Sequence, residues 1–314
     1  MDLSSIIKKI FLNFTEPLVK KNTAIKNHFK NLQQQKAWKK YFSISNDIIY
    51  TLDDNLKINL NRNSRLTEYI LFNDFEKEEI KFFYSYLKIG DIVLDVGANI
   101  GLHTLHAANA AGANGMVYAF EPVLDTYNLL LSNAALNDFK NIIPVNIGLS
   151  DAAEELCMNV STGYDAWNTL SDKNKLNGNA SIFDSTTVIH TQKLDEYLKS
   201  MHINQDKISL VKIDVEGWEK FVLLGGREFF MKANPVLMIE FDENNTWAAG
   251  YLCHELYDLL LSFGYRIYRL QNGKLYEEEK KLHYPSQNLF AVKANASIFR
   301  DRISFHDEQS SAWD

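Results

Sequence analysis

The chain has 314 residues, of which 46% are hydrophobic and 12% aromatic, enough for one large globular domain with an extension. Its net charge of −7 argues against a general nucleic-acid binder. No apolar run approaches the roughly 18 residues that a membrane span requires, and no signal peptide with a cleavage site is visible. The two cysteines, Cys157 and Cys253, lie far apart without a pairing pattern, so we expect a protein of the reducing cytoplasm.

The first 40 residues differ in charge from the rest of the chain. They contain nine lysines and two acids, which gives this arm a charge of about +7 and leaves about −14 on the remainder. Apolar residues at helical spacing from Leu3 to Phe14 predict an amphipathic helix that is too short to span a bilayer. Two interpretations stay open. This face binds an anionic membrane surface peripherally, or it packs on the main domain or on a second subunit of a homo-oligomer.

Hydrophobic periodicity divides the chain into three parts. Residues 1–74 hold the basic helix and a β-hairpin, residues 75–295 form the main domain, and residues 296–314 are a tail. Alternating strands and helices in the main domain predict an α/β fold with a Rossmann-like, doubly wound, mostly parallel sheet of seven strands. Strands are expected at 48–52, 56–60, 92–96, 116–121, 142–147, 187–193, 208–214, 235–241, 265–270 and 289–293, and helices at 75–87, 101–111, 123–137, 194–201, 217–232 and 253–263.

Residues 148–187 interrupt this alternation. They lack strong periodicity and are rich in Asn, Ser, Thr and Gly, and a stretch of this length inside a compact domain is usually functional. We expect the part from 157 to 187 to be a mobile loop that closes over the site. Tyr164 and Trp167 are its candidates for stacking on a sugar or apolar ring, although burial as loop anchors is equally consistent.

Two acids at the ends of consecutive expected strands predict the ligand. Asp95 precedes a glycine turn, and Glu121 follows about twenty residues further on, the spacing of a nucleotide-binding crevice. A carboxylate at Asp95 repels phosphate but suits the ammonium and sulfonium ions of S-adenosylmethionine, and Glu121 can accept hydrogen bonds from both ribose hydroxyls. Within the turn, Gly97 allows close approach of the backbone, Asn99 can bond locally and Gly101 relieves packing. These features predict a class I methyltransferase core.

Other polar residues near this crevice have two interpretations each. Asp151, after the third expected strand, could accept a hydrogen bond from an adenine amino group or could belong to an ordinary Ser-Asp turn. His103 and His106 lie three apart on the first helix, a spacing more typical of a packing pair than of ligands. His103 follows the glycine turn closely enough that it could still face the cofactor.

Three further acids are candidates for catalysis. Asp214 and Glu216 flank the turn after the strand at 208–214, and Glu240 ends the next strand, so all three should reach the same crevice. Such carboxylates can supply a general base, orient a hydroxyl or bind a divalent metal. We expect Asp214 to be the base, with Glu216 or Glu240 orienting it; bound Mg²⁺ would instead lower the pKa of the acceptor hydroxyl. A helix-cap role fits Glu219 better than Asp214.

These segments resemble the FkbM family of S-adenosylmethionine-dependent methyltransferases, in order and spacing, over residues 75–292. The resemblance implies O-methylation of a sugar, glycolipid or polyketide-type natural product. It also implies that the acids and glycines of the crevice contact the cofactor and that Asp214, Glu216 and Glu240 face the acceptor. The segments that carry it are Asp95-Val-Gly-Ala-Asn-Ile-Gly101, Ala119-Phe-Glu-Pro122, Lys212-Ile-Asp-Val-Glu-Gly217, Pro235-Val-Leu-Met-Ile-Glu240 and Asn288-Leu-Phe-Ala291.

Two departures from the family pattern leave the acceptor open. They are the loop 157–187 and the basic arm 1–40. Two other functions remain as alternatives. An NAD-dependent oxidoreductase is opposed by Asp95 and by Asn99 in place of a second glycine, and a non-catalytic cofactor-binding scaffold is opposed by the complete set of acids.

Overall fold

The computed structural model describes residues 30–72, 75–161, 163, 167–176, 180–293 and 302. The chain divides into two compact units, 1–48 and 49–314. In the first unit the described residues include a helix over 30–41. The predicted amphipathic face from Leu3 to Phe14 lies outside the described residues, so its membrane and packing interpretations stay predictions. Within the described part of the chain, no helix combines the length and hydrophobicity that a membrane crossing requires.

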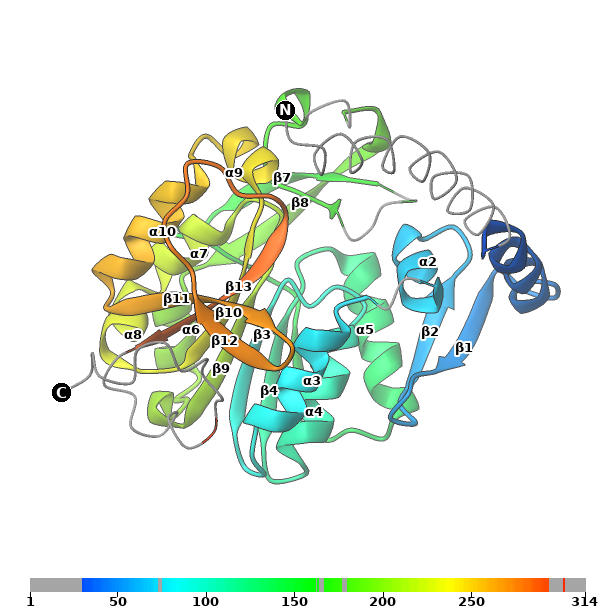
Figure 1. Ribbon diagram of the computed structural model, residues 1–314, viewed down its shortest axis with the longest axis horizontal. Helices are drawn as coiled ribbons and strands as arrows, with labels where there is room; N and C mark the ends of the chain where they lie inside the picture. The colour runs from blue at the N-terminus through cyan, green and yellow to red at the C-terminus, as the bar shows by residue number, and fades with distance from the viewer. Residues whose placement is uncertain are drawn as a thin grey trace, which may run out of the picture. The chain divides into compact units, whose positions relative to one another are not determined.

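The second unit is built around an eight-stranded sheet (Figure 1). Its order is β12-β11-β13-β10-β9-β3-β4-β5; the five strands from β10 to β5 are parallel, and the others are antiparallel to their neighbours. The central strands are mostly apolar because helices cover both of their faces. This confirms the doubly wound, mostly parallel sheet. The strands are β3 (Ile92–Val96), β4 (Met116–Phe120), β5 (Ile142–Val145), β9 (Ile208–Ile213), β10 (Val236–Phe241), β11 (Tyr265–Gln271), β12 (Lys274–Glu277) and β13 (Gln287–Lys293).

The eighth strand, β12, was not expected. It pairs with β11 as an edge hairpin across Asn272 and Gly273, both of which have positive φ. An Asn-Gly pair is a strong hairpin signal, but here it stands between Gln271 and Lys274, and the strand that follows is only four residues long, so periodicity did not reveal it.

Helices lie on both faces of the sheet (Figure 1). The expected single helix over 217–232 is wrong: the structure has two helices that meet at Gly225 and Gly226. A side chain at Gly225 would place Cβ 2.0 Å from the carbonyl oxygen of Ser150, so this close approach requires glycine and weakens the helix there. One face carries α3 (Lys77–Tyr86), α4 (Leu102–Ala111) and α5 (Leu124–Leu136), and the other carries α6 (Leu194–Ser200), α7 (Glu219–Gly225), α8 (Arg227–Lys232) and α10 (Cys253–Ser262).

The segment 148–187 contains regular structure, which corrects the expectation of a structureless stretch. It forms a three-stranded sheet of β6 (Gly148–Leu149), β8 (Ser185–Gln192) and β7 (Glu155–Val160). Alternate residues of β7 pack against Ile189, a period of two that six residues display only weakly. Strands β7 and β8 thus occupy part of the expected loop 157–187, whose mobility stays a prediction, and Tyr164 lies outside the described residues.

The N-terminal hairpin, β1 (Asp47–Thr51) and β2 (Lys57–Asn61), confirms its prediction, and α2 (Arg65–Phe72) follows it. Two asparagines bind the backbone of β2: Asn133 lies within α5, and Asn137 is the C-cap of that helix. Asn137 donates to and accepts from the backbone of Lys57, both at 2.7 Å, and Asn133 accepts from Asn59 N at 2.7 Å. Residues 49–72 thus pack within the second unit.

The buried His106 side chain should make stability depend on pH. Burial, assisted by His103, lowers the pKa of His106 from 6.5 to about 4, although Asp54 opposes the shift. As pH falls, His106 takes up its proton in the unfolded chain before it does so in the folded protein. The stability that the neutral, buried His106 provides is therefore complete above pH 6.5 and is lost as pH falls towards 4. It amounts to at most about 3 kcal/mol. Denaturant unfolding should show that the stability difference between the native protein and His106→Gln changes by this amount between pH 6.5 and 4, whereas His190→Gln, an exposed control, follows the native protein. If the difference in unfolding free energy between His106→Gln and the native protein does not change with pH, the prediction is wrong.

Candidate active site

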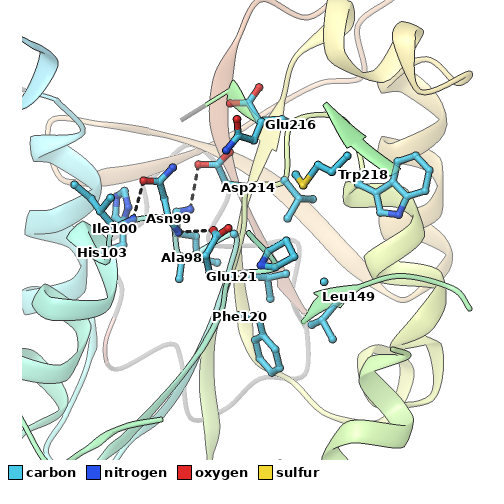
Figure 2. Close-up of a pocket in the computed structure, with 18 of the residues that line it drawn as sticks. Ala98, Asn99, Ile100, His103, Phe120, Glu121, Leu149, Asp214, Glu216 and Trp218 are labelled. Atoms are coloured by element: carbon cyan, nitrogen blue, oxygen red, sulfur yellow. Dashed lines mark hydrogen bonds and ion pairs between the residues drawn. The ribbon is translucent and has the colours of Figure 1, made fainter. Parts of the chain in front are cut away.

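A cavity, here called the cofactor cavity, opens at the carboxyl ends of β3, β4 and β9. In a parallel sheet these ends meet at one edge, where ligands of doubly wound folds bind. Figure 2 shows Asn99 and His103 on one side of it and Trp218 and Leu149 on the other. Asp214 and Glu216 lie next to each other at one end. The cavity therefore has an apolar wall facing a backbone turn, with acids at one end.

The turn after β3 contacts the turn after β9. The N–H groups of Gly97 and Ala98 both donate to Phe120 O at 3.0 Å, and Asp214 N donates to Val96 O at 3.1 Å. Gly97 has a φ of +79°, and a Cβ there would lie 1.9 Å from Asp214 O. Only glycine permits the two turns to approach this closely.

Glu121 fixes the turn from the side of β4. Its Oε2 accepts a hydrogen bond from Asn99 N at 3.0 Å, and its Oε1 accepts one from Val123 N at 2.9 Å. Burial raises the pKa of Glu121 to about 7 although both hydrogen bonds oppose this. Each carboxylate oxygen keeps a second lone pair, so the group can still accept from two ligand hydroxyls.

Asp95 lies beneath the cofactor cavity rather than on its wall. It is 1% exposed and accepts a hydrogen bond from Thr104 Oγ1 at 2.5 Å. The ammonium of Lys212, itself 2% exposed, lies 3.8 Å from Asp95 Oδ1 and 3.0 Å from Asp214 Oδ2. Burial would lower the pKa of Lys212, but Asp214 and Asp95 outweigh burial and raise it. Lys212 thus links Asp95 on β3 to Asp214 in the turn after β9.

A carboxylate and an imidazole form a second pair on the cavity wall. Glu76 Oε2 lies 2.6 Å from Nε2 of His103, and both residues line the cofactor cavity. Burial would raise the pKa of Glu76, but His103, followed by Lys212 and Asn288, lowers it to about 2. Glu76 is therefore ionised, and His103 faces the cavity rather than forming only a packing pair with His106.

The three predicted catalytic acids meet at the end of the cofactor cavity. One carboxylate oxygen from each of Asp214, Glu216 and Glu240 lies within 4.8 Å of the other two, a spacing that could hold a divalent metal. Asn245 Nδ2 donates to Glu216 Oε2 at 2.6 Å, whereas the buried Oε2 of Glu240 has no hydrogen-bond partner among the described residues. Burial, followed by neighbouring acids, raises the pKa of Glu216 and Glu240 well above the ordinary value.

The acidic turn is held by its neighbours. Glu219 Oε1 accepts from Val215 N at 3.0 Å and Gly217 N at 3.2 Å, so Glu219 supports the turn, as its expected capping role implied. From the segment between β7 and β8, Thr169 Oγ1 donates to Glu216 O at 2.6 Å. This segment thus fixes the backbone beside the acids.

Three non-glycine residues of the cavity wall have a left-handed backbone. The φ angles of Glu76, Asn99 and Glu216 are +48°, +50° and +52°. Such conformations are rare for residues with a side chain and persist where the surroundings impose them, as at binding sites.

The sequence-predicted residues separate into two groups. Gly97, Asn99, Glu121, Asp214 and Glu216 line the cofactor cavity, with Glu240 beside it. The others do not line it: Asp95 and Gly101 lie behind the wall, and Asp151 is exposed beside Ser150, which accepts a hydrogen bond from Trp218 Nε1 at 3.1 Å. The contact of Asp151 with adenine stays a prediction.

Three lining residues were given no role from the sequence: Glu76, Lys212 and Trp218. Lys212 did carry a signal, since a lysine inside a buried apolar strand must have charged partners. Glu76 carried none, because it precedes a helix nineteen positions before Asp95 and reaches the cavity only through the fold.

The family model of the "Methyltransferase FkbM domain" matches residues 95–267, more than half of the chain. The chain belongs to the FkbM methyltransferase family. It is 28% identical over 164 residues to the hexuronic acid methyltransferase AglP of Haloferax volcanii, covering 52% of this chain and 61% of that protein. It is 29% identical over 198 residues to the methyltransferase sdnD of Sordaria araneosa, covering 56% and 74%.

A third relative is much longer. The AMB antimetabolite synthetase AmbE of Pseudomonas aeruginosa is 27% identical over 279 residues, which cover 79% of this chain and 12% of the synthetase. The chain thus spans about an eighth of AmbE and less than two thirds of AglP.

The FkbM domain is S-adenosylmethionine-dependent, and the cavity fits this cofactor. Glu121 offers acceptors for ribose hydroxyls, and Leu149 and Trp218 offer an apolar wall for adenine. Asp95, Asp214 and Glu76 surround one ammonium, so the local charge is negative. That charge suits a cationic methionine moiety and opposes the pyrophosphate of NAD.

Gly97→Ala should abolish cofactor binding. The new Cβ would overlap Asp214 O, whereas Gly250→Ala shares the positive φ but meets nothing within 4 Å. Both variants bear a backbone cost of about 1–2 kcal/mol. We expect only Gly97→Ala to lose S-adenosylmethionine binding in calorimetry, with a larger drop in thermal stability. Native affinity in Gly97→Ala would show that the two turns are not in contact.

Glu121→Gln should weaken S-adenosylmethionine binding about tenfold or more, because a charge-assisted hydrogen bond contributes about 1.5–3 kcal/mol. Calorimetric titration measures this, and Glu155→Gln on the exposed side of β7 serves as control. Equal affinity in the two variants would remove Glu121 from the cofactor site. Thermal unfolding checks that the buried substitution leaves the fold intact.

Proposed function

We propose that the protein transfers a methyl group from S-adenosylmethionine to a hydroxyl oxygen of a sugar, glycolipid or natural product. The observation that carries this proposal is the meeting of Asp214, Glu216 and Glu240 at one end of the cofactor cavity. The names of AglP, a hexuronic acid methyltransferase, and of sdnD, a methyltransferase, support the same reaction class.

An acidic end favours a hydroxyl acceptor because a hydroxyl must lose its proton when its oxygen is methylated. Bound S-adenosylmethionine supplies a methyl group on a sulfonium ion, which is already an activated electrophile. The chain's contribution is to place the hydroxyl in line, which can be worth roughly 7–11 kcal/mol in favourable cases. A positioned base typically adds a further ~10²–10⁴-fold in rate.

Asp214 is the proposed proton acceptor. Lys212 Nζ donates a hydrogen bond to Asp214 Oδ2 at 3.0 Å, which fixes the position of this carboxylate in the cofactor cavity. The raised pKa values of Glu216 and Glu240 favour a proton held between those two groups. They would therefore orient the acceptor hydroxyl towards Asp214, which takes its proton.

Asp214→Asn should keep cofactor affinity but lose methyl transfer by at least about a hundredfold, because an amide has nearly the same shape but cannot accept the proton. Turnover with labelled S-adenosylmethionine and glycan or lipid extracts measures this beside a calorimetric titration. Asp125→Asn, an exposed substitution in the first turn of α5, is the control. Wild-type turnover in Asp214→Asn would make Asp214 structural.

Chelation separates the base from a metal held by the same acids. Because the Lys212 ammonium already lies 3.0 Å from Asp214 Oδ2, where it opposes a second cation, we expect turnover to persist after exhaustive treatment with EDTA. Loss of turnover that Mg²⁺ restores would assign the three carboxylates to metal binding instead.

A further inference from the structure

A second cavity, of about 470 Å³, adjoins the cofactor cavity. This volume is within the roughly 300–1,000 Å³ typical of small-molecule sites. Its wall combines the start of α3 with the carboxyl end of β10, strand β11 and the start of β13. The side chains that matter here are those of Glu76, Glu79, Glu240, Arg269, Gln287 and Asn288.

Glu76 and Glu240 separate the two cavities. Glu76 lines both, and its Oε1 accepts a hydrogen bond from Asn288 Nδ2 at 3.0 Å. Glu240 lines the second cavity, while its carboxylate lies within 4.8 Å of those of Asp214 and Glu216 on the cofactor side. A molecule in the second cavity would therefore lie beside the three acids.

Polar atoms around the second cavity lack partners. Glu240 Oε2 and Gln287 Nε2 are buried and make no hydrogen bond to the described residues. Buried polar groups are normally satisfied, and exceptions point to an absent ligand or a functional role. Two such atoms beside one cavity indicate that its hydrogen bonding is incomplete without a polar occupant.

The charge of the wall restricts that occupant. Three glutamates line the second cavity, and burial, assisted by the charge of Glu76, raises the pKa of Glu79. The cation on the rim is already engaged, because Arg269 Nε lies 3.5 Å from Glu278 Oε2 and its guanidinium covers the Tyr276 ring at 4.8 Å. The wall thus offers acids and amides, which suit hydroxyl and ammonium groups and oppose carboxylates.

We propose that the second cavity binds the methyl acceptor and selects a polyhydroxylated ring bearing an ammonium group over one bearing a carboxylate. The inference rests on the proposed O-methyl transfer and names the acceptor class for it. Its preference is opposite to what the name of the hexuronic acid relative would imply for this chain.

The test is binding of three matched probes, the methyl glycosides of glucosamine, glucose and glucuronic acid. NMR titration of the full chain with S-adenosylhomocysteine present gives the dissociation constants. We expect the glucosaminide to bind at least about tenfold more tightly than the glucuronide, because like charges are opposed. Glu79→Gln should bring the ratio towards one, whereas Glu155→Gln should keep it. Thermal unfolding confirms that both variants fold.

Equal or tighter binding of the glucuronide, a ratio unchanged by Glu79→Gln, or no binding of any probe would overturn the inference. Methyl transfer from S-adenosylmethionine is assayed in parallel. If a glycoside is methylated but its dissociation constant is the same in Glu79→Gln and the native protein, the proposed function is retained and this acceptor site is wrong. The predicted binding preference without transfer to any hydroxyl would overturn both the proposed function and the acceptor role, but not the charge selectivity of the cavity.

Discussion

The buried ammonium of Lys212 is the interaction on which the site depends. It lies on β9, in the centre of the sheet, and pairs with Asp95 beneath the glycine turn and Asp214 at the mouth of the cavity. Removing one member of a buried ion pair typically costs about 3–5 kcal/mol, because the other charge is left uncompensated. Lys212 therefore connects the floor of the cofactor cavity to the end that holds the acids.

The central fold could be predicted because its strands are buried on both faces. Strands β3, β4, β9 and β10 read as apolar runs between turn residues and were expected within a few residues of their bounds. The misses have local causes. Strand β7 is short, β12 depends on an edge hairpin, and the break between α7 and α8 depends on the contact of Gly225 with Ser150, which no local pattern contains.

The site was predictable in its residue types but not in its depth. Strand ends placed Glu121, Asp214 and Glu216 on the cavity, because parallel strands bring their carboxyl ends to one edge. Asp95 was expected to contact the cofactor; it lies within β3, is buried and pairs with Lys212, and its contact with the cofactor stays a prediction. The pairing of Glu76 with His103 joins α3 to α4 across the fold, so sequence spacing gives no indication of it.

The left-handed backbone at Glu76, Asn99 and Glu216 has a consequence for engineering. Glycine would adopt these conformations without steric cost, so replacing each residue should relieve strain of the order of 1 kcal/mol in the folded state. The same replacements would remove two carboxylates and an amide from the cavity wall. A search for thermostable variants would therefore be drawn to positions where gains in melting temperature and losses of activity arise from one substitution.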